Sequence, residues 1–393
     1  MVFTPSMHYG SSLLGPQEGL ASVTLVYQTA GIMAALAGAV LLQKFVLFMM
    51  VFLPGYLMYR NLPSGDRWSR VFAGTLYAVN PFLYTRILMG QWGFALAYAL
   101  MPVVLVSFLK LYSEPRRSTC AAAAVWTAAC AVLSPQMGVM AVLSGAAVGI
   151  FSAARPRCRA RKVAALAGAL ALLVALSGFW LLPALGRGES ASLIGRADLE
   201  AFETRSTSGA GLAVSVLGMY GYWKNQLDPL LPRGWVPGWP IIAFILAALA
   251  AAGAASVWRE TARGPLARGL LLSMTLGFLL ALGSRAPLTG PLFRFAYYHF
   301  APVRIFREPQ KFVALIAFSY AVLGGLAVER FRAARRFEAW RRGGRGTIIL
   351  VLLLLIVFMY TFRLFGGLWG EAEAVSYPQS WSEASEIIKN RTG

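Results

Sequence analysis

The chain has 393 residues, of which 58% are hydrophobic and only 13% are charged, and its formal net charge is +20. An ordinary soluble domain is about 25% charged, and a soluble chain of this length cannot hide so much apolar surface in one or two cores. These values exclude a soluble globular enzyme, a disordered protein and a disulfide scaffold, and they predict a polytopic membrane protein.

Ten apolar runs of roughly the length needed to cross a bilayer follow one another along the chain. We expect helical spans at 45–59, 71–88, 93–111, 119–132, 138–151, 163–182, 241–257, 269–282, 312–328 and 347–365. The segment 21–42 is also apolar, but residues 1–20 contain no Lys or Arg. We therefore expect 21–42 to be an interfacial or re-entrant helix on the outer side. The predicted fold is an all-α, polytopic transmembrane helical bundle.

More than half of the 36 Lys and Arg lie in five short loops between these spans. The basic loops are 60–70, 110–117, 155–162, 259–268 and 330–345. Alternation of ten spans places all five on one side of the cell membrane, which the positive-inside rule identifies as cytoplasmic. Because the charge is divided among loops, we expect membrane lipids and no nucleic acid as partners.

The same alternation makes the loops 183–240 and 283–311 extracytoplasmic, within a transmembrane domain at 1–366. The tail 367–393 is then also extracytoplasmic. Its Ser380-Trp381-Ser382-Glu383 sequence has the form of a capping box and predicts a short helix from Trp381. We expect this tail to be the start of a further soluble domain.

The first chemically informative motif surrounds Asn80-Pro81 and includes Arg86 and Gln91. Proline lacks a backbone donor and disfavours helix at the residue before it, so the span should break there. Arg86 then lies at or just inside the outer interface. A charge at that depth is either paired and functional or a snorkelling arginine at a helix end.

The second motif contains Arg304, Arg307, Glu308 and Lys311 and leads into a span from the outer side. Arginine presents a planar fork to phosphate oxygens and lysine presents a point charge. Pro309 suits a first helical turn, whose free N–H groups also attract anions. The motif predicts a phosphate cradle; the alternative is headgroup anchoring with Glu308 paired to a neighbouring cation.

Three acidic residues in the loop 183–240 are candidates for a general base or for ligands of a divalent metal. They are Asp198, Glu200 and Glu203, the last two of which would share a helical face. The alternative is a solvated surface. The three cysteines and two histidines form no zinc-binding pattern.

Aromatic residues gather in the second half of the same loop. They are Tyr220, Tyr222, Trp223, Trp235 and Trp239. Such rings stack on sugars, and they also form the interfacial belt of ordinary membrane proteins. We take Tyr220 and Trp223 as candidate substrate-binding residues.

Taken in order, the segments 77–86, 90–91, 97–102, 220–223 and 306–312 resemble the GT-C superfamily of membrane glycosyltransferases, in particular its YfhO-like and arabinofuranosyltransferase-like branches. The resemblance covers roughly residues 40–330. It implies a polyprenyl-phosphate-linked sugar donor, an extracytoplasmic active site and a catalytic acid in the first outer loop. The only acid before Asp66 is Glu18, so no residue here takes that role. Either a preceding span carries the catalytic acid, or the protein is not catalytic.

The resemblance implies transfer of a sugar to a cell-envelope glycan, lipid or protein acceptor, as part of polysaccharide biosynthesis. Arg304, Arg307 and Lys311 would hold the polyprenyl phosphate. Arg86 and Gln91 would line the same cavity, and Glu308 is a further candidate for substrate binding. The aromatic residues of the loop 183–240 would hold the acceptor. The alternative is a non-catalytic relative, or a transporter or flippase of lipid-linked saccharides. Transporters concentrate polar groups at the bilayer midplane and show paired repeats, and neither feature is evident in this sequence.

Overall fold

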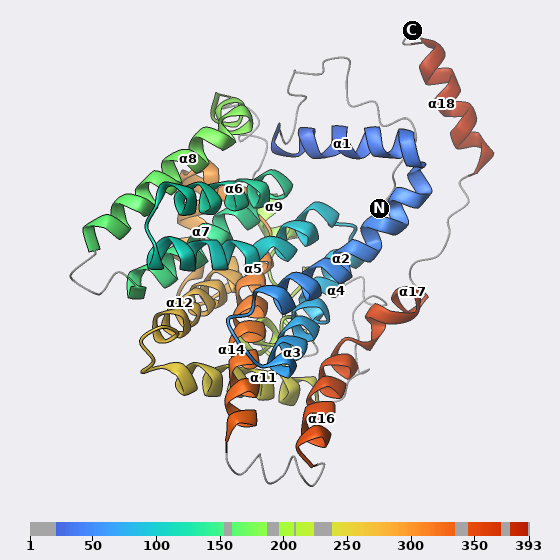
Figure 1. Ribbon diagram of the computed structural model, residues 1–393. Helices are drawn as coiled ribbons and strands as arrows, with labels where there is room; N and C mark the ends of the chain where they lie inside the picture. Colours follow the sequence, from blue (N-terminus) through green and yellow to red (C-terminus); the bar gives the residue numbers. More distant parts are fainter. Residues whose placement is uncertain are drawn as a thin grey trace. The chain divides into compact units, whose positions relative to one another are not determined.

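The computed structural model describes residues 21–152, 159–186, 196–207, 210–223, 238–334, 345–370 and 378–391. In these residues every regular element is a helix and no strand occurs (Figure 1). The chain divides into two units, Met1–Thr361 and Phe362–Gly393. The division falls shortly before the boundary expected at residue 366.

The first unit holds fifteen described α-helices and three short 3₁₀ turns. In chain order they are α1 (Ala21–Ala37), α2 (Ala39–Asn61), α3 (Arg67–Ala78), α4 (Pro81–Leu88), α5 (Trp92–Ser113), α6 (Arg117–Leu133), α7 (Pro135–Ser152), α8 (Arg159–Gly186), α9 (Arg196–Ala201), α10 (Leu212–Leu217), α11 (Trp239–Val257), α12 (Gly264–Ala281), η2 (Gly283–Arg285), α13 (Gly290–His299), η3 (Ala301–Phe306), η4 (Pro309–Phe312), α14 (Val313–Ala333) and α16 (Arg345–Tyr360).

Each of the ten predicted spans overlaps one of these helices, but two of the spans are interrupted. The span 71–88 is divided into α3 and α4, and the span 347–365 extends beyond the end of α16 at Tyr360. Seven described helices are long and apolar enough to cross a membrane. They are α2, α5, α7, α8, α11, α12 and α14 with the turn before it. The all-α bundle and the multi-pass character are therefore supported, and the number of ten spans stays a prediction.

The predicted break at Asn80-Pro81 is confirmed, because α3 ends at Ala78 and α4 begins at Pro81. Asn80 is buried, and its side-chain oxygen accepts a hydrogen bond of 2.9 Å from the backbone N–H of Leu83. Its side-chain nitrogen donates to the carbonyl of Tyr77 at 2.9 Å. One amide thus satisfies the end of one helix and the start of the next.

The apolar segment 21–42 is not one helix. Gly38 has a φ of +89°, a conformation that favours glycine, and it separates α1 from α2. Residues 39–42 consequently belong to α2, so the predicted end of the N-terminal helix is wrong. Helix α1 packs against α2, α6 and α8, and whether it lies in the membrane interface stays a prediction.

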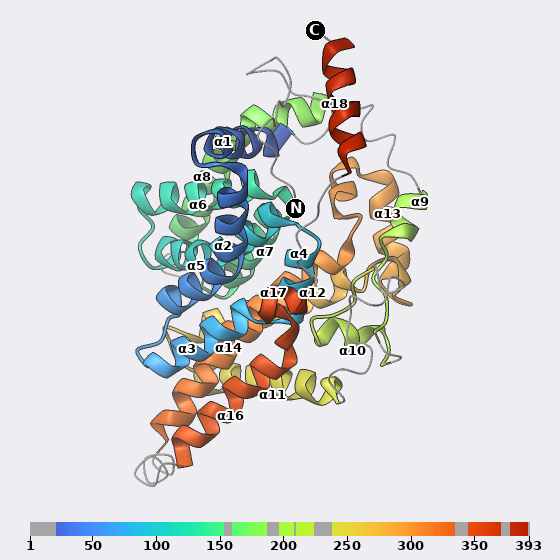
Figure 2. The ribbon, with the colours of Figure 1, turned by 90° about the vertical axis from the view of Figure 1, so that its right-hand side faces the viewer.

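Helix α14 is the core of the first unit. Every residue from Val313 to Val328 is buried. Helix α14 packs against α3, α11 and α12, and Figure 2 shows the ribbons of these helices. A helix that is apolar on all sides is one that other helices surround. Glycines let the backbones approach: a Cβ on Gly253 of α11 would collide with the carbonyl oxygen of Leu323.

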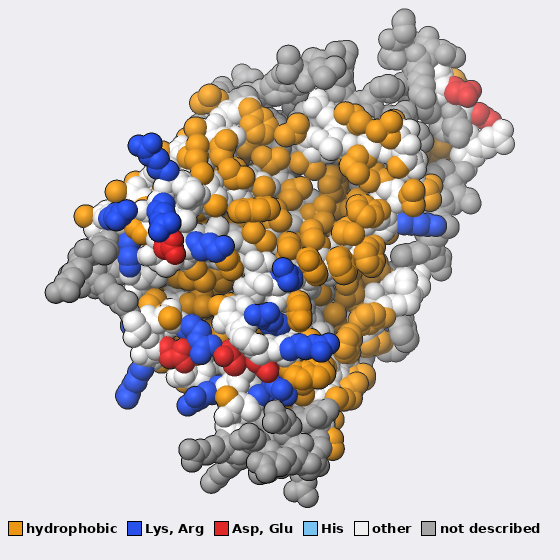
Figure 3. Space-filling model, viewed as in Figure 1, with side chains coloured by type: hydrophobic (Ala, Val, Ile, Leu, Met, Phe, Trp, Pro, Cys, Tyr) orange, Lys and Arg blue, Asp and Glu red, His pale blue; other side chains and the backbone are white. Residues whose placement is uncertain are grey.

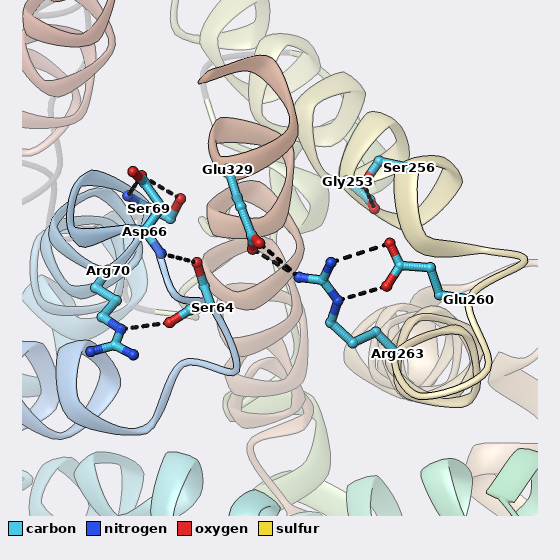
Figure 4. Close-up of polar contacts among 9 residues, drawn as sticks. All are labelled: Ser64, Asp66, Ser69, Arg70, Gly253, Ser256, Glu260, Arg263 and Glu329. Atoms are coloured by element: carbon cyan, nitrogen blue, oxygen red, sulfur yellow. Dashed lines mark hydrogen bonds and ion pairs between the residues drawn. The ribbon is translucent and has the colours of Figure 1, made fainter. Parts of the chain in front are cut away.

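Ion pairs join the C-terminal end of α14 to two neighbouring turns. Arg263 lies between Glu260 and Glu329, at 2.7 and 2.9 Å (Figure 4). Arg332 pairs with Asp66 at 3.0 Å. Burial raises the pKa of Asp66, but hydrogen bonds from Ser69 and the charge of Arg332 outweigh it and lower that pKa.

Hydrophobic side chains cover a wide part of the face seen in Figure 3, and charged side chains gather towards its lower left. Helix α2 contributes exposed aromatic residues, among them Phe45, Phe48 and Phe52. An apolar area this wide is unusual on a soluble monomer and is what contact with lipid requires.

The second unit contains η5 (Phe362–Leu364), α17 (Phe365–Trp369) and α18 (Gln379–Arg391). Helix α18 begins before Ser380, so the predicted start at Trp381 with Ser380 as its cap is wrong. Trp381 and Ile387 are exposed on it.

Candidate functional site

Four of the predicted site residues meet in one buried group, which we call the Arg86 cluster: Arg86, Gln91, Glu308 and Lys311. Arg86 comes from α4, Gln91 precedes α5, and the other two lie in the turn before α14. The Arg86 Nη1 atom donates to Glu308 Oε2 at 3.0 Å and to Gln91 Oε1 at 2.9 Å. The Lys311 Nζ atom lies 3.3 Å from Glu308 Oε1.

The cluster is almost closed to solvent and carries an excess of positive charge. Arg86 is 0% exposed, Glu308 is 6% exposed and Lys311 is 9% exposed. Two cations share one carboxylate. The buried Nε and Nη2 atoms of Arg86 have no hydrogen-bond partner among the described residues. Because an unsatisfied donor on a buried charge is costly, these two atoms mark where an acceptor would bind most favourably.

Aromatic rings surround the Arg86 guanidinium. Its Cζ atom lies 5.1 Å from the ring centres of Phe82 and Tyr222, and 5.7 Å from that of Phe94. The Lys311 Nζ atom lies 5.6 Å from the Phe94 ring. The faces of these rings attract cations and offset part of the lost hydration.

Local structure explains how these groups converge. Phe82 and Arg86 are four residues apart on α4 and therefore share one face of that helix. Hydrogen bonds to other parts of the chain hold the segment before α14 in place. Gln310 Nε2 donates to the Tyr220 carbonyl at 3.2 Å, and Gln136 Nε2 donates to the Ile305 carbonyl at 3.1 Å. Glu308 is thereby held opposite α4.

Glu308 remains ionised at neutral pH. Burial raises the pKa of its carboxyl, but the charges of Lys311 and Arg86 and the hydrogen bonds from Arg86 and Gln91 lower it to about 2. A carboxylate this firmly paired is neither a proton donor nor a free base. Its role in this arrangement is to hold the two cations in place.

The two other cations of the second motif lie outside the Arg86 cluster. Arg304 donates to the backbone carbonyls of Tyr297 and Tyr298, at 3.3 and 3.1 Å. The Cζ atom of Arg307 lies 4.6 Å from the ring centre of Phe202. Arg307 has no ion pair with a described residue, and its side chain is partly exposed. Arg307 is therefore the accessible cation beside the buried cluster. Arg304 stabilises the local backbone through its hydrogen bonds to these carbonyls.

Tyr220 and Trp223 have different surroundings. The buried ring of Tyr220 packs edge-on against Trp239 and Tyr360, and its backbone rather than its side chain contacts the site segment. Trp223 packs against Phe202 and Tyr222, at ring-centre distances of 4.6 and 5.3 Å. Trp235 lies outside the described residues.

The acidic candidates do not form a shared helical face, because α9 ends at Ala201 and Glu203 follows it. Glu203 instead accepts hydrogen bonds from Ser284 and Arg285, both at 2.6 Å. In the described part of the chain no three His, Cys, Asp or Glu side chains converge as metal ligands would. His299 bonds the carbonyl of Phe295 in its own helix.

Sequence reasoning missed the aromatic surroundings of Arg86. The spacing of Phe82 and Arg86 was a usable signal, since residues four apart on a helix face the same way. Phe94 and Phe202 gave none, because their contacts depend on tertiary packing. Two cavities found within the described residues have no lining residue from the Arg86 cluster. The chain matches no family model, no curated protein and no solved structure.

Proposed function

We propose that the protein is an integral membrane glycosyltransferase. It would transfer a sugar from a polyprenyl-phosphate donor to a cell-envelope glycan, lipid or protein acceptor on the extracytoplasmic side. The observation that carries the proposal is the Arg86 cluster: two cations on one carboxylate, with two guanidinium donors left without an acceptor. A phosphate oxygen is the ligand that such a group prefers.

In the proposed reaction an acceptor hydroxyl oxygen forms a bond to the anomeric carbon of the sugar. The bond from that carbon to the phosphate oxygen breaks, and polyprenyl phosphate leaves with the bonding electrons. Arg86, Lys311 and Arg307 would stabilise the negative charge that grows on the phosphate. The base that takes the hydroxyl proton is unassigned, and the pairing of Glu308 argues against that residue.

The orientation in the membrane belongs to the same proposal. The cavity lined by Arg60, Lys110, Lys162 and Arg263 brings four of the five basic loops together, and Arg332 of the fifth pairs with Asp66 of the first. A common, cytoplasmic side follows from the positive-inside rule. Labelling of single cysteines placed at Arg67 and Leu288 in intact cells tests it, since only the second should react with an impermeant reagent.

Arg307 gives the cleanest test of donor binding because no described residue depends on it for an ion pair. Arg307→Ala should weaken binding of polyprenyl phosphate in mixed micelles by about 10- to 100-fold, the value of one charge-assisted hydrogen bond. Arg307→Lys should recover part of the loss. Arg294→Ala is the matched control, since Arg294 is an exposed arginine on the same loop and forms no ion pair with a described residue.

Equal affinity of wild-type protein and Arg307→Ala, with both variants monodisperse and helical, would count against a phosphate site here. Transfer is then measured with a radiolabelled polyprenyl-phosphate sugar and membrane acceptors.

The alternative is a non-catalytic relative or a flippase of lipid-linked saccharides. The observation that favours it is the complete burial of Arg86, which suits a structural ion pair as well as a ligand site. Proteoliposomes loaded with labelled lipid-linked sugar separate the two functions. Movement of the label across the bilayer without transfer to an acceptor supports the alternative.

A further inference from the structure

A second site opens at the other end of the bundle, between the ends of α2, α5 and α7 and the starts of α8 and α12. Its cavity measures about 590 Å³, a volume typical of small-molecule sites. The cavity is lined by Arg60, Lys110, Lys162 and Arg263, which come from four different basic loops. No Asp or Glu is among its described lining residues, so the cavity attracts anions.

Three of these four cations have no counter-charge among the described residues. Arg263 is neutralised by Glu260 and Glu329 (Figure 4). Arg60 and Lys110 are exposed and form no ion pair with a described residue. Lys162 donates to the carbonyl of Ser152 at 2.8 Å, which is a neutral acceptor. The excess charge therefore belongs to the cavity itself and is not part of the ion-pair network beside it.

The rest of the cavity wall is mixed: Asn61, Ser113 and Thr261 are among its polar residues, and one part of it is apolar. Val106 and Leu109 of α5 and Leu266 of α12 line it beside the cations. These helices are among those long and apolar enough to cross a membrane. A ligand that uses both the cations and the apolar part of the wall carries a phosphate at one end and hydrocarbon at the other. A soluble phosphate compound would leave the apolar wall without a partner.

We propose that this cavity binds the headgroup of an anionic membrane phospholipid, and that a headgroup with two phosphates binds most tightly. Two phosphates offset two of the three uncompensated cations, whereas one phosphate offsets one. Basic pockets between membrane helices bind lipid headgroups by this electrostatic mechanism. The site is separate from the Arg86 cluster, because Gln91 and Lys110 lie at opposite ends of α5, roughly 30 Å apart by helical rise.

The test uses the full chain, purified in a neutral detergent. Lipid affinity is measured by native mass spectrometry and by thermal shift, with cardiolipin, phosphatidylglycerol or phosphatidylcholine added to the micelles. Wild-type protein should bind cardiolipin more tightly than phosphatidylglycerol, and phosphatidylcholine least. The triple variant Arg60→Gln, Lys110→Gln, Lys162→Gln should bind cardiolipin about 100-fold more weakly, the loss expected for three charges near a lipid surface.

The matched control removes the same charge from the same loops outside the cavity: Arg67→Gln, Arg117→Gln, Arg159→Gln. It should keep wild-type affinity. An equal loss of cardiolipin affinity in both triple variants would show that the effect depends only on net charge, and it would overturn the proposed site. If the cavity triple variant fails to fold, the single variant Lys110→Gln decides, because its exposed side chain holds no described partner; unchanged affinity in it overturns the proposal.

Inorganic pyrophosphate distinguishes a lipid site from a soluble phosphate site. Millimolar pyrophosphate should not displace cardiolipin, and it should raise the unfolding temperature of the protein by less than cardiolipin does. Full displacement or equal protection would overturn the assignment to lipid. No outcome depends on glycosyltransferase activity.

Discussion

Glu308 is the residue on which the charge balance of the Arg86 cluster depends. Its carboxylate is the single acid bonded to Arg86 and Lys311 among the described residues. Removing one partner of a buried ion pair leaves an uncompensated charge in a medium that solvates it poorly. A neutral replacement at this position therefore affects two cations at once.

We expect Glu308→Gln to lower the free energy of unfolding by about 3 kcal/mol, near the lower end for a broken buried pair because an acceptor oxygen remains. The unfolding temperature in detergent checks this. Glu114→Gln is the control: it removes an acid that is paired with Arg116 at the surface, and such pairs contribute little. A change in Glu308→Gln no larger than in the control would show that the cluster does not support the fold.

The same carboxylate predicts a pH dependence. Its pKa is about 2 in the folded chain and about 4.3 in an unfolded one. Because the folded value is the lower one, the carboxylate stabilises the fold fully above about pH 4.5, and this contribution is lost as the pH falls towards 2. The difference in unfolding temperature between wild type and Glu308→Gln should therefore narrow between about pH 5 and pH 3. A constant difference over this interval would contradict the pairing.

At the scale of helices, close backbone contact fixes how α11 crosses α14. Gly253→Ala would place a methyl group against the Leu323 carbonyl, and overpacking of this kind costs about 1–3 kcal/mol. Gly168→Ala is the control, because nothing lies within 4 Å of its new Cβ and alanine favours helix by up to about 1 kcal/mol. The unfolding temperature should fall in the first variant and hold or rise in the second. If both variants behave alike, the predicted contact is absent.

For the molecule as a whole, the sequence was sufficient for the long apolar helices. It was insufficient for their ends and for short loop helices such as α10 and α13. Apolar runs located ten helices, and Pro81 located the break between α3 and α4. Gly38 ended α1 earlier than hydropathy indicates, because hydropathy does not register a backbone of positive φ. The start of α18 was displaced because Ser380 does not act as its cap.

The site was predicted in part for a similar reason. Arg86 and Glu308 were identified separately, as charges beside apolar spans, yet 222 residues separate them and only the fold brings them within 3.0 Å. The rings around Arg86 follow from packing. The cavity at the opposite end was not predicted. Its cations belong to the basic loops, and the positive-inside rule already accounted for their charge without any binding site.

Helix α14 has a consequence for mutational tolerance. In the apolar stretch that includes α14, 94% of the residues are buried, whereas in the corresponding stretch of α8 only 11% are. A residue of α8 that faces outwards has room to change size, while each residue from Val313 to Val328 fits among fixed protein neighbours. A saturation mutagenesis scan should therefore show sixteen consecutive positions in α14 that do not tolerate substitution. In α8 the intolerant positions should recur with the helical period, although both helices are strongly hydrophobic.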